Sequence, residues 1–215
     1  MTLVGLTGKI CAGKNFIAGI FEQHGINVLD VDTLGHTALE NKKNLVCNHF
    51  GNSILRPDGS IDRRVLGQRV FGNRQELDVL EQIVHPEVEN LTHQWLQHIP
   101  KTGQVSAVNT ASSLCVINAA LLHKTSVADK LALVVLVDAP AWLRMYRLKK
   151  RDHLGIREIL RRIKSQKNLN HKFLFKNADI VYIRNIGIGF FRAWEKRIIE
   201  KRIKNVILHK FGIRL

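Results

Sequence analysis

The sequence predicts an α/β fold in which a parallel β-sheet is covered by helices on both sides. Segments typical of buried strands alternate with segments typical of amphipathic helices along most of the 215 residues. The expected strands are continuous apolar runs, of which Leu131–Val137 is the clearest, and such runs are typical of parallel strands buried on both faces. The length suits one compact domain with small insertions, so we expect a single domain over residues 1–215.

Composition and cysteine spacing favour a cytoplasmic protein. Hydrophobic residues make up 45 %, enough for a core, but no apolar run approaches the roughly 20 residues that a membrane-spanning helix needs. The apolar start Met1–Leu6 has no basic segment before it and leads into a glycine-rich motif, so it is interpreted as a strand and not as a signal peptide. Cys11, Cys47 and Cys115 lie far apart without C-x-x-C spacing, which argues against disulfides or a zinc site.

The N-terminal part of the chain is predicted to alternate strand and helix twice. Each strand is a short apolar run, and each helix has glycine close to its end. The expected elements are a strand Thr2–Leu6, a helix Asn15–Gln23 stopped by His24 and Gly25, a strand Ile26–Leu29, and a helix Thr33–Phe50 closed by Gly51.

Residues 57–98 are predicted to be a helical insertion, because no strand pattern occurs in them. A turn is expected at Arg56–Ser60, where proline, aspartate and glycine follow one another. The three helices predicted after it are Asp62–Phe71, Arg74–Val84 and His85–His98. The last boundary places Pro86 in the first turn of a helix, where proline is tolerated.

The rest of the chain returns to alternating strands and helices. After a loop at Lys101–Gln104, the pattern leaves open whether Val105–Val108, Leu114–Ile117 or both are strands. The elements expected beyond them are a strand Leu131–Val137, a helix opened by Ala139 and Pro140, a basic helix Gly155–Gln166, a strand Asp179–Ile183 and a helix Phe190–Ile207.

A phosphate-binding motif follows the first strand. Residues Gly8 to Lys14 read G-x-x-x-x-G-K, and Asn15 stands where serine or threonine is usual. Glycines at this spacing let the loop curl so that backbone N–H groups point at an anion, and the helix that begins there adds the positive end of its dipole. Lys14 can then reach the β- and γ-phosphates of a nucleotide. The expected phosphate-binding residues are Gly8, Lys9, Ile10, Cys11, Ala12, Gly13, Lys14, Asn15 and Phe16.

Asn15 makes metal binding at this loop unusual. The hydroxyl that usually stands at this position ligates Mg²⁺. An amide oxygen can bind a hard cation directly or through water, but it does not copy the compact geometry of a hydroxyl. We expect Mg²⁺ to accompany ATP, with Asn15 as the candidate ligand.

Asp30 and Asp32 follow the second strand. Ligands gather beyond the carboxyl ends of strands in an open α/β sheet, and a carboxylate there can accept a proton from an attacking hydroxyl. The alternative is that Asp32 caps the next helix, because it directly precedes Thr33. We favour the catalytic interpretation for Asp32 and leave both open for Asp30.

The C-terminal third is strongly basic. Residues 141–215 hold 21 Lys and Arg against 5 Asp and Glu, while residues 1–140 are nearly neutral. Arg147 and Arg151 lie four apart on one helical face, and Arg157, Arg161 and Arg162 follow. Such cations can close over a transferring phosphoryl group as a lid. A solvated basic surface and a nucleic-acid or membrane surface are the alternatives, although aromatic residues rarely interleave with the basic ones.

Several further motifs occur in order, and with them the sequence resembles the dephospho-coenzyme A kinases. The resemblance covers nearly the whole chain. It rests on the glycine-rich loop, Gly25–Asp32 with its D-x-D element, His49–Gly51, Asp58–Arg63, His85 with Pro86, Val137–Pro140, Arg147, Arg151 with Asp152, Arg162 with Gln166, and Ala178–Val181. The chain departs from the family pattern at Lys9, Cys11 and Asn15, and at Ala120–Lys124, where proline is lost and an acidic residue is replaced by lysine.

The resemblance implies a P-loop kinase core with a helical acceptor-binding insert at 57–98 and a basic lid at 147–170. It implies transfer of the γ-phosphoryl group of MgATP to the ribose 3′-hydroxyl of dephospho-coenzyme A. The implied catalytic residues are Lys14, Asp32 and Arg147, the implied acceptor-binding residues are Asp32, Arg63 and His85, and the implied lid arginines are Arg147, Arg151 and Arg162. His85 could contact a substrate phosphate or hydroxyl, or pack locally at its helix start.

Three other functions are alternatives to this one. The first is another nucleotide or small-molecule kinase with the same core. The second is a catalytically impaired ATP-binding protein, suggested by Asn15 and Lys124 but disfavoured by the presence of Lys14 and Asp32. The third is a nucleic-acid binder. We expect ATP and dephospho-coenzyme A as ligands, no nucleic acid, no membrane, and a monomer or small homo-oligomer.

Overall fold

The computed structural model describes residues 1–70, 72–99, 114–153, 155–165, 175, 177–187, 192–213 and 215. The chain forms two compact units. The first contains Met1–Leu29 and Pro100–Leu215, and the second contains Asp30–Ile99. Each unit is described by itself.

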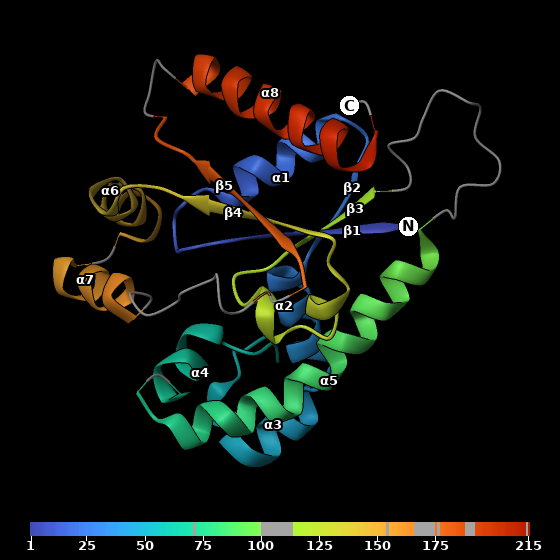
Figure 1. Cartoon of the computed structure of the whole chain (residues 1–215). Coiled ribbons are helices and arrows are strands. Elements are labelled where there is room, and N and C mark those ends of the chain that lie inside the picture. The colour runs from blue at the N-terminus through green and yellow to red at the C-terminus, as the bar shows by residue number, and fades with distance from the viewer. Residues whose placement is uncertain are drawn as a thin grey trace. The chain divides into compact units, whose positions relative to one another are not determined.

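A five-stranded sheet forms the centre of the first unit (Figure 1). Its order is β2-β3-β1-β4-β5, and β1 pairs in parallel with β3 and β4, as β4 does with β5. The predicted α/β fold with a parallel sheet is therefore confirmed. The strands are β1 (Thr2–Gly8), β2 (Asn27–Asp30), β3 (Leu114–Asn118), β4 (Leu133–Asp138) and β5 (Asp179–Arg184).

The three inner strands are almost completely buried because they consist of apolar residues on both faces. Val4, the partner of both Val116 and Leu133, has no exposed surface, and neither have those two partners. This matches the continuous apolar runs expected for parallel strands. β1 therefore lies in the middle of the sheet, and its carboxyl end carries the glycine-rich loop.

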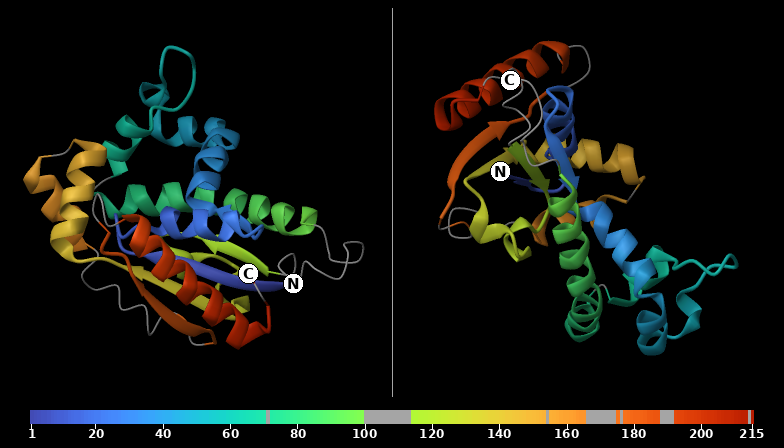
Figure 2. Two further views of the ribbon diagram at one scale, coloured as in Figure 1. Left: turned by 90° about the horizontal axis from the view of Figure 1, so that it is seen from above. Right: turned by 90° about the vertical axis from the view of Figure 1, so that its right-hand side faces the viewer.

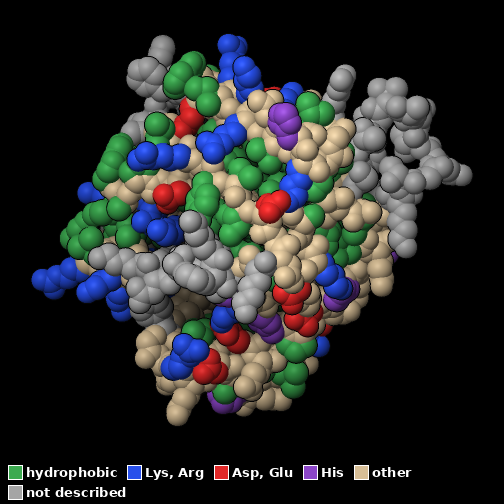
Figure 3. Space-filling view, viewed as in Figure 1, with side chains coloured by type: hydrophobic (Ala, Val, Ile, Leu, Met, Phe, Trp, Pro, Cys, Tyr) green, Lys and Arg blue, Asp and Glu red, His purple; other side chains and the backbone are tan. Residues whose placement is uncertain are grey.

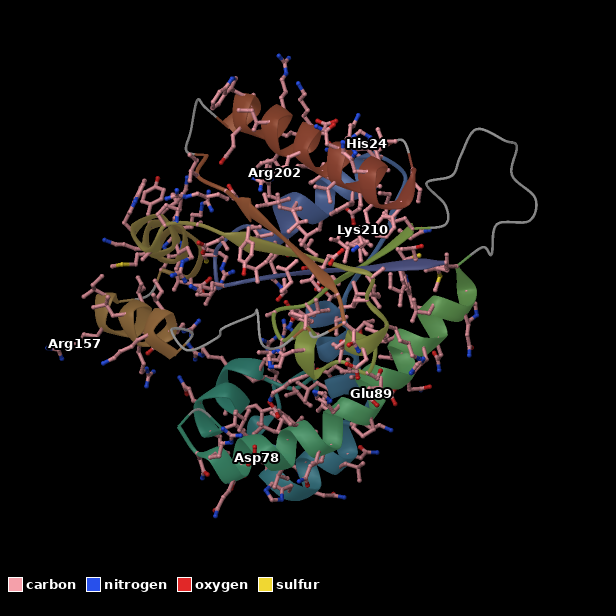
Figure 4. The ribbon with its side chains drawn as sticks, viewed as in Figure 1. His24, Asp78, Glu89, Arg157, Arg202 and Lys210 are labelled. Atoms are coloured by element: carbon pink, nitrogen blue, oxygen red, sulfur yellow. The ribbon has the colours of Figure 1, made fainter. Side chains whose placement is uncertain are left out.

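Helices α1 (Lys14–Gln23) and α8 (Arg192–Phe211) cover one face of the sheet, as the views in Figures 1 and 2 both show. Buried Ile199, Ile203 and Ile207 of α8 belong to the same core cluster as Ile17 and Phe21 of α1. A hydrogen bond between the two helical segments adds to this packing, because His24 Nε2 lies 2.7 Å from Glu200 Oε1 (His24 is labelled in Figure 4).

Short helical turns and two further helices complete the first unit. The 3₁₀ turns η3 (Leu122–Lys124) and η4 (Ala128–Lys130) follow β3, and η3 contacts β1. Helix α6 (Ala141–Asp152) follows β4 and contacts α7 (Ile156–Ser165). The region predicted as a lid, 147–170, thus begins in α6 and includes α7, and its residues 166–170 lie outside the described part of the chain.

The second unit is helical, apart from a bridge between Leu55 and Ile61, over the residues that are described. Its core contains Leu39, Val46, Phe50, Ile54 and Leu66. The bridge and the turn at Arg56–Ser60 confirm the predicted turn, since Arg56 N donates to Ser60 O over 2.8 Å. The helices are α2 (Val31–Asn41), α3 (Lys43–Phe50), η1 (Asn52–Ile54), α4 (Arg63–Val70) and α5 (Arg74–His98).

Two predicted helix boundaries in the second unit are wrong. The single helix expected over Thr33–Phe50 is broken at Lys42 into α2 and α3. Side chains on both sides of the break bind other segments: Asn41 Nδ2 donates to Glu87 Oε1 over 2.7 Å, and Lys43 Nζ donates to Gly59 O over 3.2 Å. Contacts with residues distant in sequence fix the bend, and helical periodicity carries no information about them.

The second error concerns Pro86. Two helices were expected to meet there, but α5 runs without interruption over 25 residues and contains Pro86. Proline lacks the N–H that would bond to the carbonyl four residues earlier. The packing of α2 along α5 offsets this loss, because Glu87 accepts a hydrogen bond from Asn41 and forms an ion pair with Lys42 at 3.3 Å.

The remaining predictions fall into two groups. The strand at Leu114–Ile117 is confirmed, and Cys11, Cys47 and Cys115 are free in this structure. The loop Lys101–Gln104 and the strand alternative Val105–Val108 lie outside the described residues. Over the described ranges, no helix combines the length and apolar character that crossing a membrane would take.

Candidate active site

The loop between β1 and α1 is curled, as the glycine-rich motif predicts. Ala12 N donates to Lys9 O over 3.0 Å, which closes a tight turn. Cys11 and Gly13 have positive φ angles of 56° and 100°. At the start of the loop the backbone of Gly8 lies so close to β4 that an added Cβ would be 2.3 Å from Val137 O. The sequence therefore folds into a compact turn at the carboxyl end of the central strand.

Helix α1 begins directly after this turn. Gly13 O accepts hydrogen bonds from Phe16 N at 3.1 Å and from Ile17 N at 3.3 Å, and Lys14 is the first helical residue. No acidic residue occurs in the first turn, so nothing there opposes the positive end of the helix dipole. The nine residues predicted to bind phosphate, Gly8 to Phe16, thus comprise the end of β1, the turn and the start of α1. Asn15 among them is exposed.

Arg147 of α6 forms hydrogen bonds with backbone carbonyls of this loop. Its Nη1 donates to Cys11 O and to Ala12 O, both at 3.3 Å. Its Nη2 donates to Asn185 Oδ1 at 3.0 Å and to Gly187 O at 3.1 Å. The arginine predicted to move with a lid is thus hydrogen-bonded to the loop backbone here.

Asn185 is a residue that sequence reasoning missed. It follows β5, is 4 % exposed, and its Nδ2 donates to Ala12 O at 2.9 Å. A polar residue beside the carboxyl end of a strand was the available indication, as it was for Asp30, the last residue of β2. The indication was weak because the contact joins residues 173 positions apart.

Asn118 is the second residue that was missed. It ends β3, is 1 % exposed, and its Nδ2 donates to Asn15 Oδ1 at 3.2 Å. The other amide atom, Asn118 Oδ1, is buried without a hydrogen-bond partner among the described atoms. A buried carbonyl oxygen in that state is costly unless a ligand or water binds it.

The other lid arginines are paired with carboxylates. Arg151 Nε lies 2.6 Å from Asp152 Oδ1, and Arg162 Nε lies 3.0 Å from Glu158 Oε1. The hydrogen bond from Arg151 lowers the pKa of Asp152, and that from Arg162 lowers the pKa of Glu158. Arg157 is exposed and points away from the rest of the unit (Figure 4).

The Cys11 thiol lies within this charged region of the loop. Burial raises its pKa, and the nearby positive charges of Arg151 and Arg147 only partly oppose that effect. The thiol is therefore neutral at physiological pH and adds no negative charge to a loop expected to bind phosphate.

The two aspartates after β2 have different roles. Asp30 is the N-cap of α2, since its Oδ1 accepts a hydrogen bond from Thr33 N at 3.3 Å. The alternative that Asp32 is the cap is therefore wrong. Asp32 lies in the first turn of α2 and is exposed. Its carboxylate stays a candidate for chemistry.

The other predicted acceptor residues also belong to the second unit. Arg63 is the first residue of α4 and is exposed. Asp62, just before it, accepts hydrogen bonds from Arg64 N at 2.9 Å and Val65 N at 3.2 Å, which lower its pKa. His85 is half-buried in the middle of α5, so it does not start a helix.

Basic side chains also cover the outer face of α8. Lys and Arg side chains are mixed with hydrophobic ones on the visible surface of the molecule (Figure 3), and Trp194 and Ile198 of α8 are exposed. A hollow of about 630 Å³ beside Asp179 is lined by Lys201, Arg202 and other residues of α8 (Arg202 is labelled in Figure 4). None of the predicted site residues lines this hollow.

Comparison with known proteins agrees with the resemblance stated above. The family model described as dephospho-CoA kinase matches residues 2–188. The dephospho-CoA kinase of Dehalococcoides mccartyi is 31 % identical over 206 residues, which is 95 % of this chain and 99 % of that protein. The dephospho-CoA kinase of Bacillus licheniformis is 36 % identical over 191 residues, covering 87 % and 90 % of the two chains.

Solved structures agree with the fold. The crystal structure of a Thermus thermophilus protein superposes with a TM-score of 0.74 at 29 % identity and covers 97 % of both chains. A dephospho-CoA kinase from Campylobacter jejuni superposes with a TM-score of 0.59 at 22 % identity, covering 95 % of this chain and 97 % of the other.

Proposed function

The chain belongs to the dephospho-CoA kinase family, and from this membership we propose a division of labour among its residues in phosphoryl transfer from ATP to dephospho-coenzyme A. The protein is an ATP-dependent kinase with a P-loop fold, and its reaction is the last step of coenzyme A biosynthesis. The observation that carries the proposal is the curled segment Gly8–Asn15 between β1 and α1.

The loop is proposed to hold the terminal phosphates of ATP. Its backbone N–H groups and the N-terminus of α1 supply fixed positive potential, which needs no reorganisation during the reaction. Lys14, the first residue of α1, adds a mobile ammonium group for the β- and γ-phosphates. Arg147 keeps its guanidinium against the loop, where its charge offsets that of the phosphates.

Asp32 is proposed to accept the proton of the acceptor. The ribose 3′-hydroxyl oxygen forms a bond to the γ-phosphorus while the bond to the β-γ bridging oxygen breaks, and ADP leaves. The hydroxyl proton passes to the Asp32 carboxylate. Exposure of Asp32 and the use of Asp30 as the helix cap are consistent with this role. Arg63 and His85 are proposed to bind the anionic acceptor.

The lid is proposed to comprise Arg151 and Arg162. Both are held by acidic partners in this structure, Asp152 and Glu158. Closing over phosphates would replace those carboxylates by phosphate oxygens, which are equally good partners for guanidinium groups.

The residues near the loop fit Mg²⁺, although the described part of the chain has no cluster of three or more His, Cys, Asp or Glu residues for a metal. Asn15 Oδ1 and the orphaned buried Asn118 Oδ1 are neutral oxygen donors, and Mg²⁺ bound with a nucleotide keeps several waters and takes few protein ligands. These two side chains would hold it directly or through water. When bound, the ion neutralises charge that develops on the β- and γ-phosphate oxygens.

We propose that the protein acts in the cytoplasm on ATP and dephospho-coenzyme A, as a monomer or small homo-oligomer. The reaction needs neither a nucleic acid nor a membrane.

Turnover tests the proposed function directly. Purified protein is incubated with MgATP and dephospho-coenzyme A, and ADP release and the phosphorylated product are followed. Lys14→Ala and Asp32→Asn are expected to abolish turnover. Lys130→Ala and Asp129→Asn, exposed neighbours on η4 that make the same chemical changes, are matched controls expected to keep it.

Three outcomes would contradict parts of the proposal. Turnover with another acceptor alone would identify a different small-molecule kinase. ATP binding without turnover on any acceptor would indicate an impaired enzyme. Calorimetry of ATP binding at increasing Mg²⁺ tests the metal site. Asn118→Ala is expected to weaken the Mg²⁺ dependence, and an unchanged dependence would remove Asn118 from the metal site.

A further inference from the structure

We propose that Asn185 is a positioning residue of the phosphate loop, which together with Arg147 fixes the backbone conformation in which the loop binds a nucleotide. The inference rests on the proposed function, because it assigns a task within that site. Asn185 lies after β5, and no part of the loop is close to it in sequence.

Both the nitrogen and the oxygen of the Asn185 side-chain amide form hydrogen bonds. Nδ2 donates to Ala12 O at 2.9 Å, and Oδ1 accepts from Arg147 Nη2 at 3.0 Å. The backbone N–H of Asn185 donates to Asp138 O at 2.8 Å, which holds the residue at the end of β4. The side chain is 4 % exposed, so the environment has removed its water partners. These contacts leave one orientation for the amide.

Arg147 also donates hydrogen bonds to backbone carbonyls of the loop. Its Nη1 donates to Cys11 O and Ala12 O, so Ala12 O accepts hydrogen bonds from both side chains. The planar guanidinium presents several donors in a fixed fork, which suits simultaneous contact with three carbonyls, including that of Gly187, and an amide oxygen.

Fixing these carbonyls also fixes amide directions. In a trans peptide the N–H points away from the C=O of the same peptide plane. The structure has no cis peptide bonds among the described residues. Anchoring Ala12 O on the side of Arg147 and Asn185 therefore directs the Gly13 N–H to the opposite side. A phosphate loop functions through such inward-directed amides.

Gly13 is constrained by the same contact. A Cβ at Gly13 would lie 2.0 Å from Asn185 Nδ2 and 3.2 Å from Asn185 Cγ. The second glycine of the motif thus leaves room for the asparagine that holds the preceding carbonyl. The need for glycine at position 13 therefore follows from its contact with Asn185, independently of any ligand.

The test compares Asn185→Ala with Asn185→Asp. The first removes both hydrogen bonds, whereas the second keeps the shape and the Arg147 contact but cannot donate to Ala12 O. We expect the Kd and KM for ATP to rise about tenfold in Asn185→Asp, the effect of about one lost hydrogen bond, and by at least as much in Asn185→Ala, which loses two, with the KM for dephospho-coenzyme A unchanged. Calorimetry with ATP gives the Kd without any need for turnover.

Glu195→Ala is the matched control. Glu195 Oε1 accepts a hydrogen bond from Ile186 N and is 6 % exposed, so the substitution disturbs the segment after β5 without touching the phosphate loop. It is expected to lower the melting temperature but to leave the Kd for ATP as in the wild type. Double substitution of Asn185 and Arg147 is expected to weaken ATP binding by less than the product of the single effects, because both hold Ala12 O.

The outcomes separate the two proposals. An Asn185→Asp protein with wild-type Kd and KM for ATP would overturn the positioning role, and so would equal losses in Asn185→Ala and Glu195→Ala. If the wild type binds ATP but does not phosphorylate dephospho-coenzyme A, the proposed function fails, while the calorimetric comparison still decides the role of Asn185. Should Asn185→Ala not fold, the aspartate variant supplies the result.

Discussion

Substitution of Gly13 by alanine is the sharpest perturbation of the loop. The φ angle of 100° is costly for any residue with a Cβ, about 1–3 kcal/mol. The new Cβ would also displace Asn185 Nδ2, 2.0 Å away, and so break its hydrogen bond to Ala12 O, about 1 kcal/mol more. The free energy of unfolding should fall by about 2–4 kcal/mol if the loop keeps its shape.

The loop can instead relax into another conformation. The free energy of unfolding is then largely kept. ATP binding must restore the original loop conformation, however, and a conformational cost of about 2 kcal/mol weakens ATP binding about 30-fold. Urea unfolding measures the loss in the free energy of unfolding, and calorimetry measures the loss in the free energy of ATP binding. The two losses should add up to about 2–4 kcal/mol.

Gly19→Ala is the control for this substitution. Gly19 lies inside α1, and an added Cβ would meet nothing within 4 Å. Alanine in a helix interior is favoured over glycine, so we expect stabilisation by about 0.5–1 kcal/mol and unchanged ATP binding. Identical behaviour of Gly13→Ala and Gly19→Ala in both assays would refute the reasoning.

Three further predictions concern carboxylates. Asp30→Ala removes the N-cap of α2 and should lower the free energy of unfolding by about 1 kcal/mol, whereas Asp32→Asn should abolish turnover with little loss of stability in urea unfolding. Asp152→Asn releases the lid arginines from a carboxylate and should lower the KM for ATP in steady-state kinetics; an unchanged KM would argue against a lid role for them. The hydrogen bond from His24 lowers the pKa of Glu200 below its ordinary value, so its stabilising effect is complete above pH 4.5 and is lost as the pH falls through the lower pKa of the folded state. Unfolding of Glu200→Gln and wild type from pH 7 to pH 3 should therefore show a stability difference that shrinks in acid, and a constant difference would contradict this.

The sequence was sufficient to predict the sheet and the loop because both depend on local patterns. Val4 and Leu6 lie in a short apolar run, and this run and those of β3 and β4 form buried strands. The curl from Gly8 to Gly13 follows from glycine spacing. Strand and loop together determine the fold class and most of the segment that is proposed to bind phosphate.

Residues that act through distant contacts could not be predicted in this way. Asn118 ends β3 and Asn185 directly follows β5, and an asparagine at such a position is compatible with solvent exposure as well as with burial. The bend at Lys42 and the uninterrupted helix through Pro86 also depend on partners far away in sequence, of which Glu87 is the clearest. Local propensity was overridden by packing in both places.

The contact between Ala12 and Asn185 also has a consequence for protein synthesis. The two residues are separated by 173 positions, so at about 5–20 residues per second the ribosome makes Asn185 roughly 9–35 s after Ala12. Until β5 and the residue after it are made, a nascent chain carries the complete glycine-rich motif but lacks the Asn185 side chain that binds Ala12 O. Stalled chains released before Asn185 should therefore bind ATP poorly, and this affinity would be acquired only after β5 and Asn185 have been made.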